Sequence, residues 1–201
     1  YTLKFKYNRV IYNGISILDE KNESKNDLRT ELGIPKNSFV VGHVGRFCKA
    51  KNYESILKIF EKILKRNNNI YFLLCGRNVN DGIKNKVISN KIITPGHCNN
   101  IFSYYKIMDA FIFPSKSEGQ PNSLLEAFML KIPTISSNIS SIKEIIPNEF
   151  NIPNFEPEDV NSFVEKILKV NNKEDLYDYE NVSMYFRKNF DKKIKFREFY
   201  S

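Results

Sequence analysis

Two glutamates, Glu118 and Glu126, lie on either side of a loop rich in glycine, proline, asparagine and serine. The pattern predicts that a buried strand ends at Pro114 and that a helix begins near Asn122 or Ser123. Free backbone N–H groups at the start of a helix, reinforced by the helix dipole, form a site for an anion. The segment is therefore a candidate phosphate-binding site.

The two glutamates can complete such a site. Glu126 lies about one turn into the predicted helix, where its carboxylate can accept hydrogen bonds from both hydroxyls of a ribose. Glu118 lies across the loop, near the place of a sugar beyond the phosphates, and Gly119 allows a ligand to approach the backbone closely. The alternative is that Glu126 only supports the first helical turn and that Glu118 is a solvated loop residue.

Two cations, Arg46 and Lys51, follow another strand-like run that ends in glycine. The spacing from Gly42 to Gly45 lacks the third glycine of a dinucleotide-binding fingerprint, so that motif is not indicated. Arginine binds phosphate as a planar fork and lysine as a point charge, so together the pair could neutralise a diphosphate. The alternative is two surface cations.

The only two histidines of the sequence differ in their surroundings. His43 lies within an apolar strand, which predicts a structural role. His97 follows Pro95 and Gly96 at a strand end, where it could border a pocket for a base. Asp109 is predicted to cap the preceding helix or to bond its own turn.

Short apolar runs alternate with helical patterns along the chain. The predicted strands are 39–45, 70–75, 91–94, 110–114 and 133–136, and the predicted helices are 25–32, 52–66, 81–89, 100–108, 123–130, 140–144, 157–170, 174–179 and 182–200. Because the strands are continuous apolar runs, the pattern predicts an α/β fold, a doubly wound parallel sheet (Rossmann-like) with helices on both faces. In such folds ligands bind at the carboxyl ends of the strands, where the candidate residues lie.

Composition limits the other possibilities. The chain has 201 residues, 41% of them hydrophobic, which is enough for one domain with a substantial core. No apolar run approaches the roughly 18–20 residues of a membrane span, and no signal-peptide pattern opens the chain. Because the chain starts at Tyr1, we expect a fragment of a longer protein. Three cysteines without CxxC spacing favour reduced thiols in a cytoplasmic protein over a metal cluster.

The net charge of +8 has two interpretations. One is binding to nucleic acid or to an anionic membrane surface. The other is a set of solvated lysines, which their spread along the chain favours, so we expect no nucleic-acid partner. The densest basic run, Arg187 to Lys195, could contact anionic lipid headgroups as a peripheral membrane contact.

Five motifs in order resemble those of the retaining GT-B glycosyltransferases of group 1, also called family 4. Glu118 and Glu126 have the spacing of that family's E-x7-E signature, and Lys51 stands after Val44-Gly45-Arg46 as in its diphosphate motif. The other three similar segments are Val10-Ile11-Tyr12-Asn13-Gly14-Ile15, Met108-Asp109-Ala110-Phe111-Ile112-Phe113-Pro114-Ser115 and Leu130-Lys131-Ile132-Pro133-Thr134-Ile135. The resemblance runs from about Val10 to Pro147.

The resemblance implies a role for each matching position. Arg46 and Lys51 would hold the diphosphate of a UDP- or GDP-sugar donor, Glu126 its ribose, and Glu118 the transferred sugar as the catalytic residue. Further donor-binding positions would be Gly119 and the backbone amides around Gln120, Asn122, Ser123 and Leu124, and the nucleobase would lie near Gly96 and His97. Family members typically bind the diphosphate without a metal, so we expect no metal and no cofactor.

The resemblance also implies a domain organisation. Residues 1–18 would be the linker that leads in from another domain, 19–180 the donor-binding domain, and 181–201 a C-terminal helix that packs toward an N-terminal acceptor domain missing from this chain. The setting would be bacterial polysaccharide biosynthesis in the cytoplasm, at the inner face of the membrane. A sugar-nucleotide epimerase of the same architecture and a non-catalytic sugar-nucleotide-binding module remain the alternatives.

Three positions depart from the family pattern. The loop Cys75-Gly76-Arg77-Asn78 lacks the second glycine of the family's common G-x-G, because Asn78 stands at that position, which leaves that contact open. Gln120 stands where a hydrophobic residue is frequent, and Lys131 replaces a usual glycine, with little effect expected on the chemistry.

Overall fold

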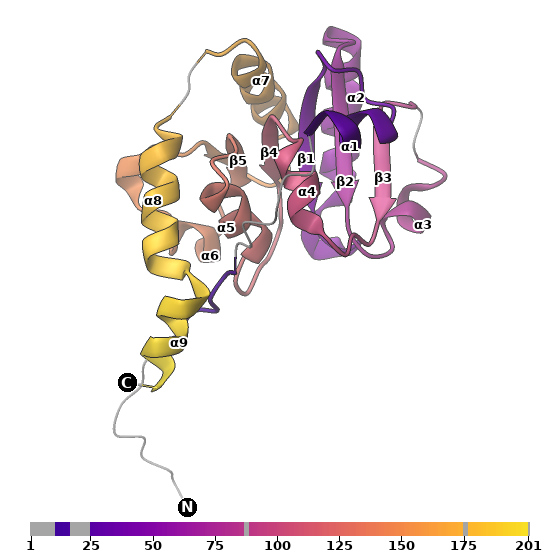
Figure 1. The fold of residues 1–201 in the computed structure, drawn as a ribbon. Helices are drawn as coiled ribbons and strands as arrows, with labels where there is room; N and C mark the ends of the chain where they lie inside the picture. Colours follow the sequence, from indigo (N-terminus) through magenta and orange to yellow (C-terminus); the bar gives the residue numbers. More distant parts are fainter. Residues whose placement is uncertain (1–10, 17–24, 87–88, 175–176, 201) are drawn as a thin grey trace, which may run out of the picture.

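Six parallel strands form one sheet at the centre of the molecule (Figure 1). The computed structural model describes residues 11–16, 25–86, 89–174 and 177–200. The order across the sheet is β3-β2-β1-β4-β5-β6, and every neighbouring pair is parallel. The strands are β1 (Phe39–Val44), β2 (Ile70–Cys75), β3 (Ile92–Gly96), β4 (Ala110–Phe113), β5 (Thr134–Ser137) and β6 (Asn154–Phe155). This strand order is that of a Rossmann-type sheet, as predicted.

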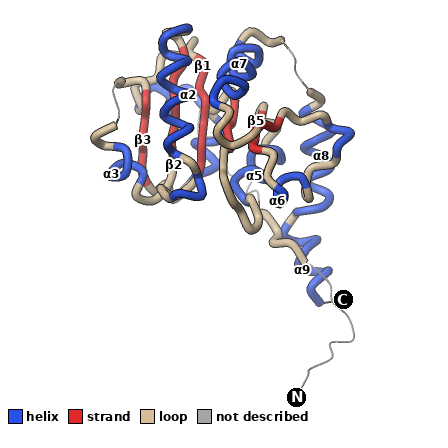
Figure 2. Tube along the Cα trace, turned by 180° about the vertical axis from the view of Figure 1, so that it is seen from behind, coloured by secondary structure: helices blue, strands red, loops and turns tan. Residues whose placement is uncertain are grey.

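Helices cover both faces of the sheet, as Figures 1 and 2 show from opposite sides. One buried cluster packs α1, α4, α5, α6 and α8 against one face, and a second cluster packs α2, α3 and α7 against the other. The helices are α1 (Lys25–Glu31), α2 (Tyr53–Arg66), α3 (Val79–Ile83), α4 (Ile101–Lys106), α5 (Asn122–Met129), α6 (Ser140–Lys143), α7 (Val160–Asn171), α8 (Tyr179–Phe190) and α9 (Lys192–Tyr200), with short 3-10 turns at Lys49–Lys51 and Asn148–Phe150.

The apolar strand runs follow from this layering. Successive side chains of a strand point to opposite faces, so Val40 joins one core cluster and Val41 the other. Phe111 and Ile112 of β4 divide in the same way. Both faces are covered, so a polar residue at any of these positions would lie in one of the two cores.

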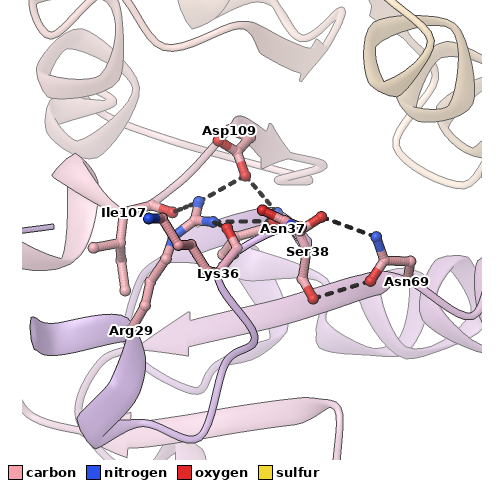
Figure 3. Close-up of polar contacts among 8 residues, drawn as sticks. Arg29, Lys36, Asn37, Ser38, Asn69, Ile107 and Asp109 are labelled. Carbon is pink, nitrogen blue, oxygen red and sulfur yellow. Dashed lines mark hydrogen bonds and ion pairs between the residues drawn. The ribbon is translucent and has the colours of Figure 1, made fainter. Parts of the chain in front are cut away.

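At the amino end of the strands, a buried arginine joins α1 to β1 and β4 (Figure 3). The Arg29 guanidinium donates to the carbonyl of Ser38 at 3.0 Å, to the carbonyl of Ile107 at 2.7 Å and to Asp109 Oδ2 at 2.8 Å. Asp109 Oδ2 also accepts from the Val40 amide at 2.8 Å. The prediction of a local cap or turn bond for Asp109 is wrong, because its carboxylate holds the starts of two strands together.

The C-terminal helices differ from the prediction. The helix expected at 174–179 is wrong, because Glu174, Tyr177 and Asp178 are not helical and Tyr179 begins the next helix, while residues 175 and 176 lie outside the described residues. The Tyr177 hydroxyl accepts from the Thr134 amide at 2.9 Å, and the Asp178 side chain caps α8 by accepting from the Asn181 amide at 3.0 Å. An N-cap starts a helix, so α8 begins at Tyr179.

The single helix expected at 182–200 is divided at Asp191, whose backbone is extended with φ −60° and ψ 137°. Residues 87 and 88 of the helix expected at 81–89 lie outside the described residues, and the described helix in this region is earlier, at Val79–Ile83. The sequence did not predict β6. α8 packs on α5 through stacked rings of Phe128 and Phe186, whose centroids are 4.6 Å apart. The direction predicted for 181–201, toward another domain, remains a prediction.

None of the helices in the described residues combines the length and apolar character that a bilayer crossing requires.

Candidate functional site

A cavity of about 630 Å³ opens at the carboxyl ends of β1, β2 and β3 and at the start of α5. It lies beside the point where the strand order reverses, between β1 and β4. Open α/β sheets bind ligands in this crevice. The predicted site residues that line it are Arg46, Lys51, His97, Gln120, Asn122, Ser123 and Glu126.

Four predicted residues do not line this cavity. Glu118 lies beside it, in contact with Lys51. The Leu124 side chain is fully buried in the core, and Gly96, with φ +79°, lies against Asn80. Gly119 has open space where a side chain would begin, since no atom lies within 4 Å of that point.

Lys51 and Glu118 form an ion pair. Lys51 Nζ lies 2.8 Å from Glu118 Oε1 and 4.5 Å from the ring centroid of Phe113. Only 15% of the Lys51 side chain and 11% of the Glu118 side chain are exposed. Charges so poorly solvated each depend on a partner, so neither side chain can leave the pair unless another charged or polar group replaces it.

Backbone contacts bring these two residues together from separate loops. The amide of Lys116, in the loop after β4, donates to the carbonyl of Ala50 at 2.8 Å. Asn52, buried and left-handed with φ 54°, donates to the carbonyls of Pro114 at 3.1 Å and Pro157 at 2.8 Å. Left-handed backbone suits asparagine better than most residues. The loops after β1 and β4 therefore form one joined structure.

Close backbone packing shapes the floor of the cavity. The Gly45 amide donates to the carbonyl of Cys75 at 2.9 Å, and Tyr53 donates to the carbonyl of Gly45 at 2.7 Å. Gly76 has φ +153°, and a Cβ there would lie 2.0 Å from the Gly45 oxygen. Only glycine permits this approach. Arg46, the residue after Gly45, is exposed, and no carboxylate of the described residues pairs with it.

Glu126 lines the cavity from the second turn of α5, and a tyrosine of α4 holds its carboxylate. The Tyr105 hydroxyl of α4 donates to Glu126 Oε2 at 2.8 Å and also lies 3.0 Å from the carbonyl of Ser123. Burial raises the pKa of Glu126 above its ordinary value, although the Tyr105 hydrogen bond and the charge of Lys51 oppose the shift. Oε1 has no hydrogen-bond partner in the described part of the chain, so it can accept from a ligand.

The start of α5 keeps part of its anion-binding capacity. The Asn122 amide donates to the carbonyl of Gln120 at 2.9 Å, and the Leu124 amide donates to the carbonyl of Pro121 at 3.0 Å. The amides of Gly119, Gln120 and Ser123 have no acceptor within the described residues. These three amides can therefore donate to a phosphate or sugar without first breaking another hydrogen bond.

Comparison with known proteins identifies the family. The family model "Glycosyl transferases group 1" matches residues 24–189. The chain belongs to the group 1 glycosyltransferase family. The family resemblance predicted from the five motifs is thereby confirmed.

Curated relatives of this group 1 chain include the capsular polysaccharide biosynthesis glycosyltransferase CapH of Staphylococcus aureus, 36% identical over 148 residues, which are 70% of this chain and 39% of CapH. The UDP-Gal:alpha-D-GlcNAc-diphosphoundecaprenol alpha-1,3-galactosyltransferase of Escherichia coli is 28% identical over 156 residues, 73% of this chain and 40% of that protein. The chain thus spans about two fifths of the length of these relatives.

Solved structures show the same fold. Anabaena HepE, solved in complex with UDP and glucose, has a TM-score of 0.77 and 19% identity over 95% of this chain and 55% of HepE. A glycosyltransferase from Rickettsia africae ESF-5 also has a TM-score of 0.77, with 21% identity over 90% of this chain and 51% of that one.

His43 has a structural role in this group 1 domain, as predicted. It is fully buried, and its Nδ1 donates to the carbonyl of Ile112 at 3.0 Å. Burial lowers the pKa of His43 to about 3, and the charge of Lys51 adds to the shift. The ring is therefore neutral near pH 7. His97, in contrast, is exposed at the cavity wall.

Sequence reasoning missed several residues of the group 1 site. Cys75 and Cys98 line the cavity beside Ile101, and Tyr105 supports Glu126. Cys75 is the last residue of one predicted strand and Cys98 follows the end of another, positions that could have pointed to them. Tyr105 gave no signal, because its contact with Glu126 depends on how α4 packs against α5. In the described chain no three residues among His, Cys, Asp and Glu are close enough to hold a metal ion.

Proposed function

We propose that this chain is the donor-binding domain of a retaining glycosyltransferase, which binds a nucleotide-diphosphate sugar and, together with an acceptor domain outside this chain, transfers the sugar with retention. The observation that carries the proposal is the composition of one cavity. Two cations, an uncapped helix start and a partly free carboxylate meet there, next to a second carboxylate. Each is suited to a different part of a sugar nucleotide.

The diphosphate would be bound by Arg46, Lys51 and the start of α5. Arg46 is unpaired among the described residues, so it can contact phosphate directly. Lys51 would exchange Glu118 for phosphate, one anion for another, so that the ammonium is never buried alone. As the sugar departs, negative charge grows on the diphosphate, and these donors stabilise it without reorganising.

The same exchange would free Glu118. A carboxylate released from Lys51 can accept hydrogen bonds from the hydroxyl groups of the transferred sugar. This is the role proposed for Glu118 as the catalytic residue. It would also lie near the positive charge that develops at the anomeric carbon. Binding of the diphosphate and positioning of the sugar are thus linked through one ion pair.

Glu126 would bind the ribose. Its free Oε1 and its Tyr105-bound Oε2 can each accept one of two adjacent hydroxyls. His97 and the backbone near Gly96 would border the nucleobase on the far wall of the cavity.

The names of the relatives support a UDP- or GDP-sugar donor. One Escherichia coli relative is named for UDP-Gal, and Anabaena HepE was solved with UDP and glucose. We propose that this chain needs no metal or other cofactor, because its cations can neutralise the diphosphate. The capsular relatives support bacterial polysaccharide synthesis, and we propose that it takes place in the cytoplasm. There the basic run Arg187 to Lys195 would contact anionic lipid at the membrane's inner face.

A thermal-shift panel tests the proposal on the whole protein that carries this chain. UDP-, GDP-, ADP- and CDP-sugars are added separately, and one of the first two is expected to raise the melting temperature most. Arg46→Ala and Lys51→Met should lose the shift. The proposal is contradicted if the sugar nucleotides raise the melting temperature of these variants as much as that of the wild type.

Product analysis separates the alternatives. An epimerase converts its sugar nucleotide without an acceptor, and a binding module leaves it unchanged when an acceptor is present. Either outcome overturns the assignment as a transferase.

A further inference from the structure

The side chain of Gln120 is paired with the backbone of Asn13, a residue 107 positions away in the sequence. Gln120 Nε2 donates to the Asn13 carbonyl at 2.8 Å, and the Asn13 amide donates to Gln120 Oε1 at 2.6 Å. A side-chain amide thus satisfies both polar groups of one backbone residue. The hydrophobic residue frequent at this position in the family could form neither bond.

The other side of this segment is fixed to the junction of α8 and α9. The Ile15 amide donates to the carbonyl of Phe190 at 2.7 Å, and the Lys192 amide donates to the carbonyl of Ile15 at 2.9 Å. A Cβ at Gly14 would lie 2.5 Å from the Lys192 Cα, so these backbones are in close contact. Figure 1 shows the indigo segment of residues 11–16 beside the start of α9.

The junction is also where the C-terminal part of the chain changes direction. α8 packs on α5 through Phe186, whereas α9 begins after the extended Asp191. Phe196 of α9 is 61% exposed. Gly14 and Ile15 therefore contact the point where α9 departs from the rest of the domain.

On its other side, Gln120 belongs to the donor site. It lines the cavity, and Glu118 and Gly119 precede it directly. Besides the hydrogen bond from the Lys116 amide to Ala50, the loop between β4 and α5 is held by the ion pair of Glu118 with Lys51 and by the pairing of Gln120 with Asn13. Donor binding would open the ion pair and leave the pairing of Gln120 with Asn13 in place.

We propose that Gln120 is a positioning residue that couples donor binding to the segment at residues 11–16 and, through Ile15, to the α8–α9 junction. This inference rests on the proposed function, in which residues 1–18 lead in from the acceptor domain. A shift of the donor loop on the diphosphate is transmitted to Asn13 through two hydrogen bonds. Conversely, a shift of the linking segment moves Gly119 and Glu118 relative to the sugar.

Hydrogen exchange on the whole protein tests the coupling, with calorimetry of UDP- and GDP-sugar binding alongside. In the wild type, saturating donor is expected to change amide exchange in residues 11–16 at least about threefold. In Gln120→Leu that response should vanish even at saturating donor. If Gln120 only stiffened the loop, Gln120→Leu would weaken donor binding, but at saturating donor the change in amide exchange at residues 11–16 would remain.

Two further variants frame the result. Gln120→Glu keeps the acceptor for the Asn13 amide but loses the donor, so an intermediate response is expected. Ser117→Ala alters the same loop at an exposed side chain and should respond as the wild type does.

The outcomes distinguish the two proposals. Absence of donor binding to the wild type overturns the proposed function. Normal binding without a response at residues 11–16, or an undiminished response in Gln120→Leu, overturns the coupling alone.

Discussion

Lys51 and Glu118 neutralise each other at the edge of the cavity, with Nζ and Oε1 2.8 Å apart and both side chains largely buried. The two residues come from loops 67 positions apart that backbone hydrogen bonds join. In the proposed function, Lys51 of this pair would bind phosphate and Glu118 would bind the sugar. Donor binding would then exchange one ionic interaction for another and leave no buried charge unpaired.

Lys51→Met should weaken nucleoside-diphosphate binding about 10- to 100-fold, because a charged hydrogen bond contributes roughly 1.5–3 kcal/mol. It should also lower stability, since Glu118 loses its buried partner. Calorimetry and denaturant unfolding measure the two effects. Lys49→Met, an exposed lysine of the same turn, is the matched control. Adding Glu118→Gln to Lys51→Met should restore stability without restoring affinity, and recovery of affinity would contradict the account.

Glu126→Gln should separate stability from binding. Burial raises the Glu126 pKa, so its contribution to stability is present below the unfolded-state pKa and is lost as pH rises through the folded-state pKa. The variant should therefore melt higher than the wild type near pH 7, with a smaller difference near pH 4. It should bind UDP or GDP more weakly, by roughly tenfold. A 2′,3′-dideoxy nucleotide should show no such loss, and an equal loss would argue against ribose binding.

His43 should make the domain sensitive to acid. Its pKa is lowered to about 3 by burial, so in the unfolded state the ring takes up a proton that the folded state excludes. The stability from the neutral ring is complete above about pH 6.5 and falls by about 1.4 kcal/mol per pH unit below it. Because other groups titrate in both proteins, the informative quantity is the difference in unfolding free energy between the wild type and His43→Asn. A difference that stays constant from pH 7 to 4.5 would contradict the assignment.

Lys131 ends α5 in the left-handed region, with φ +61°. Its amide donates to the carbonyl of Phe128 at 3.0 Å, and the Ile132 amide donates to that of Ala127 at 3.1 Å, the pattern of a Schellman cap. Lys131→Gly should raise stability by about 1 kcal/mol, since the ion pair with Glu180 is exposed and contributes little.

Two other lysines serve as controls for this effect. Lys173, with φ +60°, ends α7 in the same way, and Lys173→Gly should stabilise similarly. Lys62 lies inside α2, where Lys62→Gly should cost about 1 kcal/mol. The explanation would be refuted if unfolding curves gave changes in unfolding free energy of the same sign for Lys131→Gly and Lys62→Gly.

Much of the fold could be predicted, because strand ends and helix faces are marked by local patterns. β1 and β2 are continuous apolar runs, and α2 repeats buried residues on one face, at Ile56, Ile59 and Ile63. The break at Asp191 could not be predicted, since it depends on Ile15 bonding between α8 and α9 from far along the chain. β6 has only two residues, too few to show any period.

The site could be predicted in part, because local sequence patterns also mark the strand ends and helix starts at which its residues lie. Arg46, Lys51 and Glu126 line the cavity, and the sequence could place them because the two cations follow a strand end and Glu126 lies one turn into a predicted helix. The ion pair of Lys51 with Glu118 was not predicted, although both residues were named, because sequence places residues on loops without showing which loops meet. Tyr105 and the Gln120 pairing with Asn13 were missed on the same ground.

The most direct test of the central claim is an NMR titration of the isotopically labelled 201-residue chain with UDP and with GDP. The account predicts saturable amide shifts with one of them, gathered at residues 45–51, 96–98 and 119–126 around the cavity. Arg46→Ala should weaken them without moving them elsewhere. Shifts confined to the basic run Arg187 to Lys195, or no shifts at millimolar nucleotide, would contradict the claim that this cavity binds a nucleotide-diphosphate donor.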